Sequence, residues 1–409
     1  MKRTAVVVWF GLAAIAAFGA TAAERPTFGS FEDHADVGEA RQRGSVRFDP
    51  AALTYAVTGG GDNMWFAKDA LHFVWTQMLG DISLTADIRW PTPGGNPHRK
   101  AVLLIRQTLE PDSAYASATL HGNGLTSLQY REVRGGPTRE IQSSMSAPQR
   151  LRITREGDYV FMSIAREGEG LRPAGGSFRI KLREPFMVGL GVCAGDHAAM
   201  ETAEFSRVEI NTGRPAGPSR FVLESTLETV AVASKERRVV LTARERFAAP
   251  FWSSDGKALL YRRGAASSVF TVPASGGEPR RHTAPGGGPR AGASSDGRHL
   301  YFGSERPGTT QVRRTRADGT EPVAVTDDPF PNCFPQPSPD GKWLLVLSYE
   351  EGVKGCPANK DVTLRLLPLA GGEVLVLAKL FGGRGTIDLP PWSPDSAHVA
   401  FVSYRLAAP

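Results

Sequence analysis

A short motif that returns four times in the C-terminal half of this 409-residue chain is its most constraining feature. In its fullest form the motif reads Ser-Pro-Asp-Gly, and its Asp residues lie 41, 44 and 55 positions apart. A spacing in the low forties is typical of β-propellers, in which each blade has four strands. The motif predicts a tight hairpin turn, because Pro suits its second position and Gly accepts a positive φ at its fourth. The four turn anchors are Asp255, Asp296, Asp340 and Asp395.

Apolar strand-like runs follow each anchor, and a second turn separates one anchor from the next. These second turns lie at residues 274–277, 317–320 and 369–372, so three blades are expected between the first and last anchors. The ends of the array supply complementary halves of a fourth blade, an outer hairpin at residues 227–241 and an inner pair at 399–404. We expect these halves to pair, which closes the ring and removes exposed sheet edges. An open array is the alternative.

This repeat, with an anchor turn and a second turn in each copy, resembles the WD40-like PD40 repeat of TolB-type periplasmic propellers. Four copies of the anchor carry the resemblance, although the first two have Ser in place of Pro, and Ser396 replaces the Gly of the last. TolB-type propellers usually have six blades, so four blades would make this a reduced ring. The resemblance implies a propeller that docks envelope proteins or peptides.

The N-terminal half shows short runs with strand-like patterns. In residues 82–90 every second side chain is apolar, which is the period of a half-buried strand. Residues 101–105 are continuously apolar, as in a strand covered on both faces. Residues 150–164 indicate a hairpin around a turn at 155–158. With no long stretch of helical periodicity, two packed antiparallel sheets are the expected result.

The opening segments of this half resemble a concanavalin A-like lectin/glucanase jelly-roll domain. They are residues 59–66, 69–75 and 80–81. The resemblance implies the jelly-roll fold and raises carbohydrate as a ligand class. Trp65 follows a Gly-rich loop and is the candidate for stacking on a sugar ring. Core packing is the alternative for Trp65 and the expectation for Trp75 and Trp90.

The N-terminus has the pattern of an export signal. Lys2 and Arg3 precede an apolar run at residues 5–18, and small residues at 20–23 offer a cleavage site. The run is short for a membrane span, so we expect a periplasmic or secreted protein with no span after signal cleavage. The expected order is a signal peptide at 1–23, a concanavalin A-like β-sandwich at 24–212, a linker at 213–220 and a TolB-like PD40 propeller at 221–409.

Charge and motifs narrow the function classes. The formal net charge is +6, but the basic residues are spread along the chain, so no nucleic-acid partner is expected. Asp62, Asp69 and Asp81 show no spacing that forces them together as a catalytic pair, and we interpret them as turn caps. No G-x-S-x-G elbow and no zinc motif occurs. A calcium ion in the Gly-rich loop would find carboxylates there, but no ligand spacing supports it. We therefore expect neither an enzyme nor a cofactor.

The third internal blade carries an insertion at residues 348–361. Cys356 in this insertion and Cys333 before the blade's first strand belong to loops on one rim, so we predict that they form a disulfide in an oxidising compartment. Two free thiols are the alternative. Loops on this rim are where propellers usually bind. The partner-binding candidates are Tyr349, Asn359, Lys360 and Asp361. The alternative is that they are solvent-exposed loop residues with no role in binding.

These features lead to one expectation about function. The chain would be an exported cell-envelope binding protein, whose propeller docks a protein or peptide and whose sandwich recognises carbohydrate. The alternative is a secreted carbohydrate-active enzyme, a glycoside hydrolase or lyase, with the propeller as an accessory module.

Overall fold

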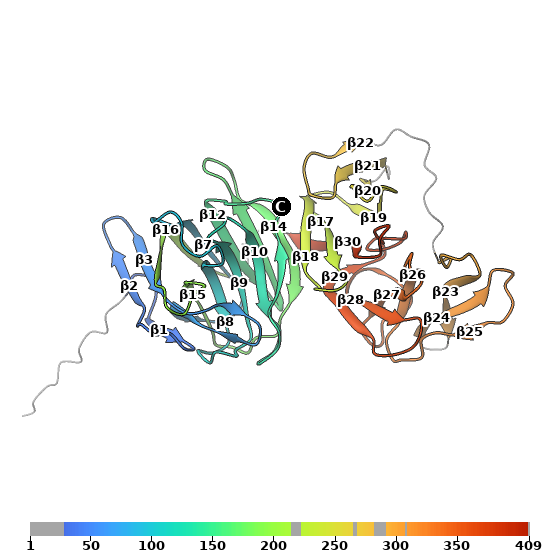
Figure 1. Ribbon diagram of the computed structural model, residues 1–409, viewed down its shortest axis with the longest axis horizontal. Coiled ribbons are helices and arrows are strands. Elements are labelled where there is room, and N and C mark those ends of the chain that lie inside the picture. The colour runs from blue at the N-terminus through green and yellow to red at the C-terminus, as the bar shows by residue number, and fades with distance from the viewer. Residues whose placement is uncertain (1–27, 214–221, 265–267, 282–291, 307–308, 408–409) are drawn as a thin grey trace, which may run out of the picture.

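The chain is an all-β protein in which a sandwich and a propeller lie side by side (Figure 1). The computed structural model describes residues 28–213, 222–264, 268–281, 292–306 and 309–407. The expected signal peptide, and all of the expected linker except Gly213, lie outside these ranges. Within them, no helix has the length and apolar character needed to cross a membrane.

The N-terminal module is a jelly-roll sandwich of two antiparallel sheets. The larger sheet has the strand order β1 (Asp33–Val37), β6 (Leu71–Met78), β15 (Phe186–Cys193), β8 (Lys100–Arg106), β9 (Tyr115–His121), β10 (Thr126–Arg131) and β11 (Arg139–Gln142). The facing sheet has the order β14 (Arg172–Arg179), β13 (Tyr159–Ala165), β12 (Arg150–Glu156), β7 (Ile82–Arg89), β16 (Glu201–Thr212), β3 (Thr54–Gly59) and β2 (Ser45–Asp49).

The two sheets enclose one apolar core. The alternating side chains Ile82, Leu84, Ala86 and Ile88 of β7 all lie in it, which confirms the predicted half-buried strand. The partly buried Trp90 packs against the same core.

A short hairpin, β4 (Met64–Trp65) and β5 (Lys68–Asp69), folds over the outer face of the larger sheet. There Met64 packs in a second apolar cluster with Phe73 and the buried Trp75, which confirms the expectation that Trp75 is a core residue. The hairpin therefore covers a face of the sheet that would otherwise be open to solvent.

The C-terminal module is a small four-bladed propeller (Figure 1). Three blades follow one another in sequence. The first contains β19 (Phe247–Trp252), β20 (Ala258–Arg263), β21 (Ser268–Pro273) and β22 (Arg280–Arg281). The second contains β23 (His299–Arg306), β24 (Thr309–Arg316) and β25 (Val323–Ala324). The third contains β26 (Asn332–Pro337), β27 (Trp343–Tyr349), β28 (Ala358–Pro368) and β29 (Leu375–Gly383).

The fourth blade is shared between the two ends of the array, as predicted. The strands β17 (Val222–Ala231) and β18 (Arg237–Ala243) form its outer hairpin. The last strand, β30 (His398–Ala407), pairs with β17 along its whole length. A bridge between Trp392 and Val399 completes the blade on its inner side. The chain ends of the propeller are thus held together by a full strand ladder.

Each anchor motif closes its turn with the same hydrogen bonds. The Ser hydroxyl donates to the Asp carboxylate, which also accepts the backbone N–H two residues further on. Gly at the fourth position has φ between 68° and 71°, and Ser396, its replacement in the last copy, adopts φ 60°. The Ser396 hydroxyl accepts the backbone N–H of Asp340 at 3.0 Å, so this departure from the motif links the third and fourth blades.

Apolar clusters join three of the blade junctions: fourth to first, third to fourth, and second to third. Tyr301 of β23 packs on the third blade, so its neighbours Leu300 and Phe302 point the other way. Both stay exposed. In the described part of the chain, no apolar cluster joins the first blade to the second. Among the described residues, apolar packing therefore joins the four blades at three junctions, and the paired chain ends form one of these blades.

The two modules share one sheet. The outer strand β18 of the fourth blade pairs in parallel with β11 of the sandwich, with Ile141 opposite Arg237. The larger sandwich sheet therefore continues through β18 and β17 into β30. At this seam Arg237 forms an ion pair with Glu228 at 2.7 Å, and neither side chain is exposed. Burial raises the pKa of Glu228, while Arg237 and Ser403 act against that rise.

The anchors predict how the protein responds to acid. Hydrogen bonds from the motif Ser hold the pKa of Asp255, Asp296 and Asp395 below its usual value near 3.8. A carboxyl whose pKa is lowered by folding adds stability above its unfolded pKa, and that contribution is lost as the pH falls through its folded pKa.

We therefore expect the melting temperature of the wild-type protein to fall as the pH drops below about 4. The triple variant Asp255→Asn, Asp296→Asn, Asp395→Asn should lose less stability over that range, because it has fewer carboxyls to protonate. Thermal unfolding followed by circular dichroism between pH 3 and 6 checks this. Equal acid dependence of the two proteins would show that the anchors do not contribute in this way.

Candidate functional site

A cleft of about 600 Å³ lies between the sandwich and the third blade. The sandwich lines it with the loop after β10, Tyr159 of β13 and the residues around the end of β14. The propeller lines it with β28, β29, the end of β27 and the loop before β26. β14 and β29 also pack against each other where the modules meet (Figure 1). A volume of this size is typical of a ligand-binding site.

Two exposed apolar side chains line this cleft from opposite modules. Val133 of the sandwich is 64% exposed, and Phe330 of the propeller is 42% exposed. Tyr159, Val374 and Val376 add further apolar surface. Single exposed apolar residues are ordinary, whereas those that converge on one hollow mark an interaction site.

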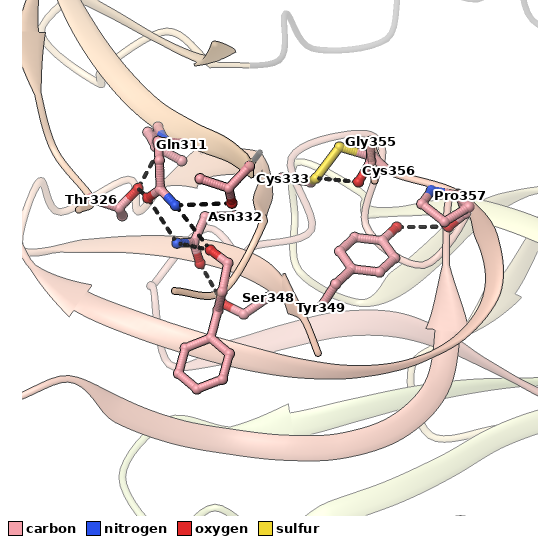
Figure 2. The surroundings of a disulfide bond; sticks show 12 residues. Gln311, Thr326, Asn332, Cys333, Ser348, Tyr349, Gly355, Cys356 and Pro357 are labelled. Carbon is pink, nitrogen blue, oxygen red and sulfur yellow. Dashed lines mark hydrogen bonds between the residues drawn. A yellow bond between two sulfur atoms is a disulfide. The ribbon is translucent and has the colours of Figure 1, made fainter. Parts of the chain in front are cut away.

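A buried hydrogen-bond network fixes the propeller wall, and Figure 2 shows it next to the disulfide. Asn332 accepts the Ser348 hydroxyl at 2.6 Å and donates to the carbonyl of Phe330 at 2.9 Å. Gln311 donates to the same carbonyl at 3.1 Å and accepts the Thr326 hydroxyl at 2.5 Å. Because satisfied buried networks are rigid, the loop that carries Phe330 has a defined position.

Ion pairs connect the modules around the cleft. Arg179 of the sandwich binds Glu350 and Asp361 of the third blade at 2.5 and 3.2 Å. Lys379 of β29 binds Glu132 at 2.6 Å. All of these groups are partly exposed, so each pair contributes only about 0.2–1 kcal/mol. They bridge the two walls of the cleft.

The predicted disulfide is present between Cys333 and Cys356, whose Cα atoms are 6.2 Å apart (Figure 2). It ties the insertion of the third blade to that blade's first strand. A cross-link that spans 23 residues stabilises a folded protein by about 3 kcal/mol in the chain-entropy account. The insertion is therefore anchored at the rim beside the cleft.

Tyr349 is among the residues that line the cleft, but its side chain is buried and not exposed on the rim as the sequence-based prediction had it. Its side chain is 1% exposed within the apolar cluster between the third and fourth blades. Its hydroxyl donates to the carbonyl of Pro357 at 2.7 Å (Figure 2), and burial raises its pKa. The period of two along β27 is the reason, because it directs Ser348 to the polar network and Tyr349 to the core.

The other three rim candidates divide into two kinds. Asn359 and Lys360 are exposed where β28 begins, at a bulge in the ladder with β29, and neither lines the cleft. Asp361 does line it and binds Arg179. Burial raises the pKa of Asp361, and the nearby Asp158 adds to the rise. Contact of these residues with a partner stays a prediction.

Trp65, the candidate for sugar stacking, is half-buried in the hairpin of β4 and β5. The Lys100 ammonium lies 5.2 Å from the centre of its ring and donates to Asn63 at 2.7 Å. Burial lowers the pKa of Lys100 to about 8. The neighbouring Phe66 is 75% exposed, so the hairpin presents Phe66 to solvent more fully than Trp65.

The sequence did not indicate a buried ion cluster beneath this hairpin. Asp69 binds Arg131 at 2.7 Å and Arg106 at 3.2 Å, and none of the three side chains is exposed. The interpretation of Asp69 as a turn cap was therefore wrong. Its partners are 62 and 37 positions away in the chain, and only the folding of the hairpin over the sheet brings them together.

The remaining two carboxylates of the set lie apart. Asp81 accepts the backbone N–H of Gly157 at 2.7 Å, which makes it a cap between two loops. Asp62 is exposed beside His197. Across the described ranges, no group of three or more His, Cys, Asp or Glu side chains is placed to hold a metal ion.

Comparisons with known proteins give partial similarities, and no known family profile matches the sequence. The uncharacterized protein Atu1656 of Agrobacterium fabrum (strain C58 / ATCC 33970) is 39% identical over 157 residues, 37% of this chain and 53% of that protein. The chain thus spans about half the length of this relative. A solved structure described as a putative TolB from Agrobacterium tumefaciens is 27% identical with a TM-score of 0.37, covering 45% of this chain and 99% of that one. Domains LG4-5 of the mouse laminin alpha1 chain are 11% identical with a TM-score of 0.23, covering 72% and 81%.

Proposed function

We propose that this chain is an exported cell-envelope protein that acts by binding, and that the cleft between its modules docks a peptide segment of a partner protein. The observation that carries the proposal is the convergence of Val133 and Phe330, both exposed, on one cleft from two modules. A peptide that places an apolar side chain between them would remove both from water, at about 25 cal/mol for each Å² buried.

The charges around the cleft support binding more than chemistry. Arg179 is compensated by Glu350 and Asp361, and Lys379 by Glu132. Groups that neutralise one another hold a shape, whereas catalysis generally requires a general base, acid or nucleophile poised to react. We therefore propose that the protein is a binding protein and not an enzyme.

Two features support an envelope location. Structural disulfides such as Cys333–Cys356 persist in oxidising compartments, such as the bacterial periplasm. The N-terminal sequence, with Lys2 and Arg3 before an apolar run, has the pattern of an export signal.

Carbohydrate recognition by the sandwich is a second candidate, and a different hollow favours it. This hollow of about 880 Å³ is lined by Trp90, His121, Asn123 and Gln149. In the described part of the chain, Trp90 Nε1, His121 Nδ1 and Gln149 Oε1 have no hydrogen-bond partner. These three atoms are themselves buried, so the groups open to the hydroxyls of a sugar are the exposed polar side chains of the lining, among them Asn123, Arg166 and Glu167.

The docking proposal predicts that Val133→Asp and Phe330→Ala weaken partner binding at least tenfold, because each removes apolar contact at the centre of the site. A partner is first captured from a detergent extract of the envelope, then purified and titrated by calorimetry against each variant. Leu79→Asp is the control, since Leu79 is equally exposed but lies outside the cleft. A purified partner that binds both cleft variants as tightly as the wild type would refute docking in this cleft.

The carbohydrate proposal predicts binding on a glycan array that is lost in Trp90→Ala and retained in Trp65→Ala. The reason is that Trp90 lines the polar hollow, whereas Trp65 lies outside it. Binding that disappears only with Trp65→Ala would place the carbohydrate site at the hairpin of β4 and β5. An array without any signal would refute carbohydrate recognition by the sandwich.

A further inference from the structure

We infer that the cleft selects its peptide by a carboxylate, which Arg365 binds next to an apolar side chain held by Phe330. This inference rests on the proposed docking function and specifies the chemistry of the docked segment.

Arg365 is held so that part of its guanidinium stays free. Its Nη1 donates to Asp328 at 2.7 Å, to Ser348 at 3.3 Å and to Asn332 at 3.4 Å. In the described part of the chain, its Nε and Nη2 have no hydrogen-bond partner, although the side chain lines the cleft and is 15% exposed. A guanidinium has five N–H donors in a planar fork, so one side is fixed and the other remains for a ligand.

The surroundings of Arg365 suit an acid with an apolar neighbour. The Phe330 ring centre is 5.6 Å from its Cζ, and the exposed Val133 lines the same cleft from the other module. A carboxylate in line with the free N–H groups would therefore have apolar surface beside it. Carboxylate pairs with Arg are often bidentate, which gives them both strength and direction.

One cation of the cleft has no counter-charge in the described ranges. The lining contains Arg179, Lys181, Arg365 and Lys379 with Glu132, Glu350 and Asp361, and Arg365 is paired with Asp328, which lies outside the lining. All three carboxylates are bound by Arg179 or Lys379. Lys181 is exposed and has no ion-pair partner among the described residues. A ligand carboxylate would compensate this charge, whereas a basic side chain would add to it.

The carboxylate has two sources in a protein, a chain terminus or an Asp or Glu side chain. We propose to separate them with two random peptide libraries panned on the wild-type protein, one with free C-termini and one with the random segment in the interior of the displayed chain. Enriched peptides are then synthesised as the acid and as its neutral analogue, either the C-terminal amide or the Gln or Asn form. Their affinities are measured by fluorescence anisotropy.

The expected result is enrichment of peptides with a carboxylate beside an aromatic or aliphatic residue. The neutral analogue and Arg365→Gln should each weaken binding about tenfold or more, the size typical of a charged hydrogen bond. Lys181→Gln, at an exposed position that disturbs no contact, should weaken it severalfold, which keeps the test valid if Arg365→Gln unfolds. Arg316→Gln, at an exposed Arg of the second blade, is the matched control and should bind as the wild type does.

Three outcomes would overturn the inference in distinguishable ways. Peptides that depend on Phe330 and Val133 but bind equally well as neutral analogues leave docking intact and remove the carboxylate. Enrichment that is indifferent to Phe330→Ala and Val133→Asp, or no enrichment at all, contradicts the docking function as well. Self-association in size-exclusion chromatography that Val133→Asp abolishes would assign the cleft to a second copy of the chain instead of a peptide.

Discussion

The buried ion pair between Glu228 and Arg237 is the interaction on which the arrangement of the two modules depends. Arg237 also donates to the backbone carbonyl of Ser177 in the sandwich, and Ser403 of the last strand donates to Glu228. The pair thus connects β14, β17, β18 and β30 at one point. Removing two charges from water costs several kcal/mol for each ion, and these contacts offset that cost.

The shared sheet follows from the same constraint. With β18 paired to β11 over two residue pairs, the outer edge of the fourth blade and one edge of the larger sandwich sheet meet. Unpaired strand edges promote aggregation, so the seam protects both modules. It also sets the distance between β14 and the third blade, and the cleft with Val133 and Phe330 is a consequence of that distance.

Much of the architecture is predictable from the sequence because the signals are local. The Ser-Pro-Asp-Gly turns mark the blades through their own hydrogen bonds, and the half blades at 227–241 and 399–404 are complementary, so their pairing is the expected result. The disulfide of Cys333 and Cys356 follows from the same topology, because the start of the third blade's first strand and the insertion after its second strand lie on one rim.

The sites are less predictable because they depend on distant segments. Asp69 meets Arg106 and Arg131 only after the hairpin has folded over a sheet. Val133 lies in an ordinary loop in sequence, and nothing near it reveals that Phe330 will line the same cleft. The seam between β11 and β18 leaves no pattern either, since parallel pairing over two residues has no periodic signature. Tyr349 shows the opposite problem, because its place beside the insertion suggested an exposed residue. Its side chain packs into the core instead.

The measurement that tests this account most directly is calorimetric unfolding of the wild-type protein and of Glu228→Gln. If the seam joins the modules into one unit, the wild type unfolds in a single cooperative transition. Glu228→Gln leaves Arg237 buried without its counter-charge, which costs about 3–5 kcal/mol, so the variant should melt earlier and in two separate steps. Two independent transitions in the wild type, or a variant that melts as the wild type does, would contradict the claim that this pair holds the molecule together.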